Sequence, residues 1–233
     1  MTSQAGIEDR TRWDGWRRHA RESVLDVNDG IVSAAGIAEG IATSGAGLNT
    51  LLVAGVVTIL AGGSAAAGAK YTEVRTEWEM NRELIRAERD AIAADPDGEF
   101  EELVGLYREK GLDDDLARRV AKALTDRDPV AAHCDVELRL ELSDAGSGAA
   151  TAGLIAGLSY GAGASIPLLS IMLLPIGGRV EITFALVLFA LALTGCFAAW
   201  LTGLPAVKLI LRNVLLGTAT MLASLFLGLL IAT

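Results

Sequence analysis

Charged and apolar residues are separated into long blocks along this chain, and that separation limits its fold more than any other sequence feature. Apolar stretches of about 20 residues are long enough to cross the roughly 30 Å hydrocarbon core of a bilayer as α-helices. A soluble domain would instead alternate apolar and charged residues at the helical or strand period. We therefore expect an all-α, polytopic membrane protein with five transmembrane helices. The predicted spans are residues 24–43, 48–69, 149–175, 181–202 and 209–232.

A polar, acidic insert separates the second predicted span from the third and holds most of the chain's charged side chains. Because no glycine or proline occurs between Gly68 and Pro96, we expect the second span to continue into the insert as one helix. The chain is thus predicted to have four parts. They are a cytosolic amphipathic segment (1–22), spans one and two (23–69), the cytosolic helical insert (70–148) and spans three to five (149–233).

The distribution of charge indicates the partners and the orientation. The formal net charge is −9, which argues against nucleic acid as a partner. Basic residues in the short segments beside the spans gather mainly on the side of the N-terminus and the insert, which the positive-inside rule assigns to the cytosol. Trp13 and Trp16 lie among arginines there, as in segments that rest on the lipid bilayer surface. We expect an integral protein of a prokaryotic inner membrane.

The first predicted span contains acidic residues that are costly in a bilayer. Glu22, Asp26 and Asp29 are spaced by four and three residues, which places them on one helix face. Intramembrane carboxylates usually face a bundle interior, an ion pathway or a cation. Glu22 and Asp26 either share such a role or sit only at the membrane interface, whereas we expect the deeper Asp29 and Glu39 to be functional. Glu39 would accept a proton or an ion that Asp29 releases, or it would only hydrogen-bond across a helix interface.

A second group of candidate residues lies in the insert. Carboxylate, imidazole and thiolate together suit a divalent metal such as Fe(II), Mn(II) or Zn(II). The alternative is that these acidic helices present ordinary solvated faces. We see no nucleophile elbow, phosphate-binding loop or paired-cysteine zinc motif, so we do not expect an enzyme. The candidate metal ligands are Glu88, Glu99, Glu102, His133, Cys134 and Glu137.

Several segments resemble the vacuolar iron transporter-like proteins of the VIT family. Val27-Asn-Asp-Gly-Ile-Val-Ser33 resembles the family signature at the start of the first span. The small-residue second span running into Tyr71 and a long acidic helix, followed by Asp95-Pro96 and Glu99-xx-Glu102, is similar as well. The resemblance implies a homodimer that exports Fe2+, or a similar ion such as Mn2+, from the cytosol in exchange for protons. It implies no permanently bound cofactor, because the metal ion is the substrate.

The resemblance also assigns roles by position. It makes Asp29 the pathway aspartate, and it places His133 and Cys134 where some members carry two methionines. The metal-binding glutamates of the family correspond to Glu88, Glu99, Glu102 and Glu137.

Three positions depart from the family pattern. Thr58 replaces the second-span glutamate of the pathway, Ala66 replaces a second-span methionine, and Ala91 replaces an insert glutamate. Glu39 would restore one carboxylate from the neighbouring helix. Two functions therefore stay open: a divalent-metal transporter, or a membrane-anchored metal-binding or regulatory protein that has lost transport.

The orientation can be tested by labelling. With five spans, Thr233 lies on the opposite side of the membrane from the insert. An engineered cysteine near Asp114 should resist an impermeant thiol reagent added outside intact cells, and one at Thr233 should react. The reverse pattern would overturn the orientation and with it the direction of transport.

Overall fold

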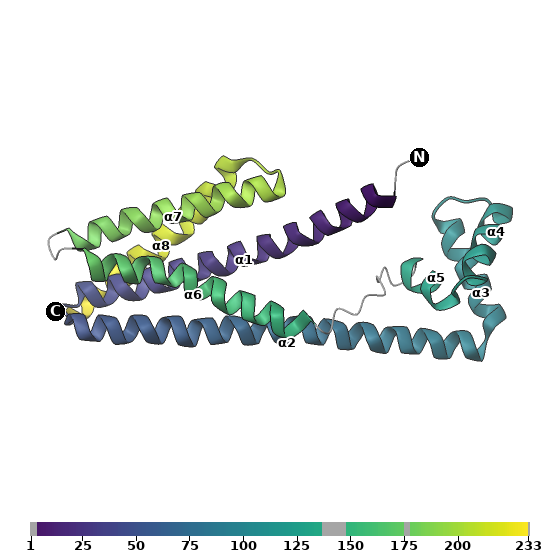
Figure 1. The fold of residues 1–233 in the computed structure, drawn as a ribbon, viewed down its shortest axis with the longest axis horizontal. Coiled ribbons are helices and arrows are strands. Elements are labelled where there is room, and N and C mark those ends of the chain that lie inside the picture. Colours follow the sequence, from purple (N-terminus) through teal and green to yellow (C-terminus); the bar gives the residue numbers. More distant parts are fainter. Residues whose placement is uncertain (1–3, 137–147, 175–177, 233) are drawn as a thin grey trace. The chain divides into compact units, whose positions relative to one another are not determined.

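The structure, a computed structural model, describes residues 4–136, 148–174 and 178–232, and within them it is entirely helical (Figure 1). The all-α prediction is confirmed for these residues. The helices are α1 (Gln4–Thr43), α2 (Leu48–Ala94), α3 (Pro96–Glu109), α4 (Asp114–Thr125), α5 (Pro129–Val136), α6 (Ala149–Leu173), α7 (Arg179–Thr202) and α8 (Ala206–Ala232).

Four of the described helices, α2, α6, α7 and α8, are long and apolar enough to cross a membrane. Helix α1 is long enough, but it is not among the four. Its second half carries Asp26, Asp29 and Glu39, and these carboxylates lower its hydropathy. The five-span count, which needs α1 as the first span, stays a prediction.

The chain divides into two compact units. Residues 1–71 and 150–233 form one, here called the membrane unit because it holds the apolar helices, and residues 72–149 form the other, the insert unit. Helix α2 contributes to both, because it runs without a break from Leu48 to Ala94. The predicted continuation of the second span into the insert as one helix is confirmed.

In the membrane unit α1, α7 and α8 pack on one another. Their shared core is a cluster of fully or almost fully buried side chains that includes Ile31, Ala35, Val187 and Leu191. These residues recur every four positions on α1 and on α7, so one face of each helix is committed to the contact. The spacing that buries this face of α1 therefore also fixes which residues of α1 lie opposite which residues of α7.

Helices α1 and α6 approach until their backbones touch. A β-carbon at Gly163 would lie 2.9 Å from the carbonyl carbon and 3.0 Å from the α-carbon of Val27. A β-carbon at Gly30 would lie 2.8 Å from the backbone nitrogen of Ala164. Only glycine fits such a crossing, as in other small-residue helix contacts in membranes. The contact lies beside Asp29 and holds that part of α1 against α6.

The insert unit has its own core, formed by α3, α4 and α5 and centred on residues such as Leu103, Val104 and Ala121. On its surface Arg118 makes a two-pronged ion pair with Glu101, with nitrogen–oxygen distances of 2.5 and 2.8 Å. The hydrogen bonds from this guanidinium lower the pKa of the Glu101 carboxyl below its ordinary value. The pair ties α3 to α4.

The α1–α6 contact gives a stability prediction. Gly163→Ala should destabilise the protein by about 1–3 kcal/mol, the usual cost of overpacking, because Val27 backbone atoms occupy the space of the new methyl group. The measurement is the thermal unfolding temperature of the purified protein in detergent.

Gly161→Ala, on the same helix, is the matched control. Its new β-carbon would meet only the Ile59 methyl group, at an ordinary 3.7 Å. This variant should unfold at or slightly above the wild-type temperature, since alanine favours helix more than glycine does. Equal effects of the two substitutions would show that the backbone contact is not what holds α1 to α6.

Candidate metal centre

Three ligand-type side chains converge in the insert unit from three separate helices. The His133 Nδ1 atom lies 3.0 Å from Glu88 Oε1 and 3.8 Å from Glu99 Oε2. One ligand atom of each residue lies within 4.8 Å of the other two. The His133 side chain is 2% exposed and that of Glu88 is 10% exposed, so this group is largely removed from water.

Local sequence explains how these side chains meet. A single residue, Asp95, separates α2 from α3, and its carboxylate accepts a hydrogen bond from the Gly98 backbone N–H at 3.0 Å. This cap, followed by Pro96 in the first turn, starts α3 and places Glu99 near its N-terminus. Asp128 caps α5 in the same way, through the Ala131 N–H, and so positions His133.

The six predicted metal ligands do not all come together. Glu102 is exposed on α3, and Cys134 is fully buried on α5, but neither belongs to the group that the described residues form. Glu137 lies outside the described residues. The structure thus brings together Glu88, Glu99 and His133.

Two carboxylates and one imidazole are a chemically coherent donor set. Imidazole suits iron and zinc, and carboxylate suits harder ions such as manganese. Burial from water strengthens the attraction between a divalent ion and these groups. The group can therefore hold a divalent cation with one ligand atom from each helix.

The predicted pathway residues lie in the membrane unit, where they differ in exposure. Asp29 is exposed on the surface of the unit. Asp26 is half-buried and lines a small pocket with His19 and Glu22. Lys70 closes this pocket from α2 and pairs with Glu22 at 3.2 Å.

Glu39 differs from Asp29 in being completely buried. Thr58, also buried, donates a hydrogen bond of 2.7 Å to the Ala54 carbonyl of its own helix. Its hydroxyl proton is therefore committed to the backbone. Ten residues of helix, or about 15 Å, separate Glu39 from Asp29, so the two carboxylates do not form one site.

Hydrogen bonds between hydroxyl groups and other side chains of the apolar helices were not anticipated from the sequence. Ser170 and Thr183 share a buried hydrogen bond of 2.8 Å between α6 and α7. The Thr194 hydroxyl donates to Asn28 Oδ1 at 2.5 Å, joining α7 to α1. The sequence feature that could have predicted these bonds is the presence of hydroxyl residues in otherwise apolar spans, where a polar group needs a partner.

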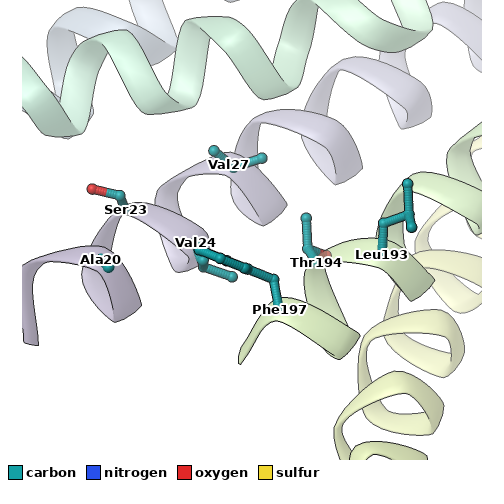
Figure 2. Close-up of a pocket in the computed structure, with 7 residues that line it drawn as sticks. All are labelled: Ala20, Ser23, Val24, Val27, Leu193, Thr194 and Phe197. Atoms are coloured by element: carbon teal, nitrogen blue, oxygen red, sulfur yellow. The ribbon is translucent and has the colours of Figure 1, made fainter. Parts of the chain in front are cut away.

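Figure 2 shows a pocket between α1 and α7 that offers little to a metal ion. It is lined by Ala20, Ser23, Val24, Val27, Leu193, Thr194 and Phe197, nearly all through carbon atoms. None of these residues carries a titratable side chain. The pocket is thus not a candidate for the metal centre.

Comparison with known proteins decides the family. A profile of the VIT family matches residues 20–229. The chain belongs to the VIT family. The resemblance seen in the sequence is thereby confirmed.

Several relatives of this VIT family member are named vacuolar iron transporters. It is 35% identical over 124 residues to the Vacuolar iron transporter of Acanthamoeba castellanii, a match that covers 53% of this chain and 43% of that protein. It is 25% identical over 201 residues to the Vacuolar iron transporter of Centaurea cyanus, covering 84% and 81%. It is 27% identical over 188 residues to Vacuolar iron transporter 1 of Arabidopsis thaliana, covering 78% and 74%.

Membership in the VIT family and four apolar helices long enough to cross a bilayer make this chain an integral membrane protein. The prokaryotic inner membrane stays a prediction, as do the orientation and the roles of the individual site residues.

The metal centre of this VIT family member can be tested by direct binding. Glu99→Gln should weaken Mn2+ binding to the purified protein by about tenfold or more, because it removes a charged ligand. Glu109→Gln, on the same helix but exposed and outside the group, should change the affinity less than twofold, about the level of diffuse attraction. Isothermal titration calorimetry measures both. Equal losses would mean that the insert attracts cations only through its overall negative charge.

Proposed function

We propose that the chain is a secondary transporter that moves a divalent metal ion, Fe2+ or Mn2+, out of the cytosol in exchange for protons, and that it works as a homodimer. The observation that carries the proposal is the convergence of Glu88, Glu99 and His133 in a member of the VIT family. The names of its relatives support iron as the substrate.

In this proposal the insert unit captures the ion. Two carboxylates and a neutral imidazole give a donor set that binds a divalent ion and releases it when protons compete for the same atoms. Relative to a methionine-containing site, the His133 imidazole is a harder ligand and so favours iron and manganese over softer ions.

The membrane unit would supply the route. We infer that α1 crosses the membrane despite its carboxylates, because Ile31 and Ala35 are fully buried against α7 and α8 and Gly30 lies against α6. Asp29 is exposed on the surface of a single copy of the chain. A carboxylate that faces lipid within a span is energetically costly. A second copy of the chain covering Asp29 would place one such carboxylate from each protomer beside a shared path.

The alternative is a membrane-anchored protein that binds metal without moving it. It is favoured by Thr58, whose hydroxyl proton bonds to Ala54, and by Ala66, which packs among apolar residues. Neither residue supplies the ligand that the family pattern has at that position. The alternative predicts metal binding by the insert and no flux.

Flux separates these functions. Purified protein in liposomes with an imposed pH gradient should transport Mn2+ or Fe2+, measured with a fluorescent indicator inside the vesicles. Asp29→Asn should lower the rate at least about tenfold, because it removes the charge that would hold the ion in the path.

Asp126→Asn is the matched control, since Asp126 is exposed in the insert unit and pairs only with Lys122 among the ion pairs described. This variant should transport at the wild-type rate. Metal binding without flux in the wild-type protein would establish the alternative function.

A further inference from the structure

We propose that Glu39, together with the hydroxyl pair of Ser170 and Thr183, forms a buried proton-binding site, and that its proton is the one exchanged for metal. The second part rests on the function proposed above. The first part concerns only the membrane unit and can be tested without transport.

The burial of Glu39 is the starting observation. Its side chain is 0% exposed, and neither carboxylate oxygen has a hydrogen-bond partner within the described residues. An ionised carboxylate in that setting lacks both water and a compensating charge, which is strongly unfavourable. A bound proton removes the charge, so the arrangement fits a neutral carboxylic acid.

The register of α1 against α7 places Glu39 level with Thr183. Asn28 of α1 is bonded to Thr194 of α7, and Ile31 and Ala35 pack in one cluster with Leu191 and Val187. Residue numbers thus rise along α1 as they fall along α7. Glu39 follows Asn28 by eleven residues, and Thr183 precedes Thr194 by eleven. Eleven residues are about three helical turns, so both side chains return to the face on which the bonded pair lies.

The hydroxyl pair offers what a neutral carboxyl group needs. Each hydroxyl has one proton to donate and two lone pairs to accept. The hydrogen bond between Ser170 and Thr183 uses one of the two protons. The other proton can be donated to the Glu39 carbonyl oxygen, and the spare lone pairs can accept the carboxyl proton.

Few charged groups face this region. Helix α6 and the membrane half of α2 have no charged side chain. Helix α8 meets this part of α1 through Ser224, which lies against Gly36 and Gly40. The charged residue Arg212 of α8 is twelve residues, or about 18 Å along the helix, from Ser224.

At the start of α7 the Arg179 guanidinium donates to the Leu174 carbonyl at 3.1 and 3.2 Å. Glu181, two residues before Thr183, is exposed. It marks the end of α7 that we take as the side from which a proton reaches Glu39.

These surroundings favour a proton over a metal ion. A divalent ion held by one carboxylate and two hydroxyls would keep a net positive charge in an enclosed, apolar region. A proton leaves the site neutral. The only bond made or broken is the O–H bond of the Glu39 carboxyl group, formed from the side of Glu181 and broken on release toward the cytosol.

Infrared spectroscopy tests the site directly. The full-length protein in lipid, at neutral pH and with metal removed by a chelator, should show the carbonyl stretching band of a protonated carboxylic acid. Glu39→Gln should abolish this band, because the amide has the same shape and cannot bind the proton as a carboxyl group does. Glu181→Gln, two residues from Thr183 but exposed, should keep it.

The hydroxyl pair is tested by Thr183→Val, which keeps the shape of the side chain and removes its hydroxyl. The band should persist but move to higher frequency, because a carbonyl that loses a hydrogen bond stiffens. An unchanged frequency would overturn the assignment of the hydroxyl pair. Absence of the band in the wild type, or its persistence in Glu39→Gln, would overturn the proton site itself.

The coupling role is tested by flux. Glu39→Gln should lower pH-driven Mn2+ transport at least about tenfold while the Mn2+ affinity of the insert stays within about twofold of wild type. Wild-type flux in this variant would overturn the coupling role. A wild-type protein that shows the band and carries no Mn2+ or Fe2+ would overturn the proposed transport and support the proton site.

Discussion

The approach of α1 to α6 at Gly30 and Gly163 is the constraint on which the rest of the membrane unit depends. Backbones in contact leave no space for side chains at the crossing, so the position of α1 along α6 is set by shape and not by charge. The contact also places Asp29, next to Gly30, on the exposed side of α1. A helix whose second half carries three carboxylates, Asp26, Asp29 and Glu39, is thereby held in a bundle of apolar helices.

The two units hold their polar groups by different means. In the insert unit, caps at Asp95 and Asp128 orient short helices so that Glu99 and His133 meet Glu88. In the membrane unit, polar groups meet because long helices share a register, as Asn28 and Thr194 do. A cap depends on a few neighbouring residues, whereas a register depends on two whole helices. A substitution in a cap therefore affects one helix start, and a substitution that shifts the register affects every contact along the two helices.

Much of the fold could be predicted from the sequence because its signals are local. Apolar blocks marked α2, α6, α7 and α8, and the absence of glycine and proline between Gly68 and Pro96 marked the continuation of α2 into the insert. The ligand group was only partly predictable, since spacing along α3 made Glu102 as good a candidate as Glu99. Its selection depends on the turn between α2 and α3 and on the packing of α5. The Ser170–Thr183 pair could not be predicted from the sequence for the same reason, because its partners come from different helices.

The contacts that hold α1 leave it little freedom to move along its own axis. A shift of α1 by one helical turn, about 5.4 Å, would bring a residue larger than glycine into the crossing with α6 and would break the hydrogen bond between Thr194 and Asn28. Helix α1 is thus a fixed element of the membrane unit. Any movement that changes the surroundings of Glu39 must then come from the helices packed around α1.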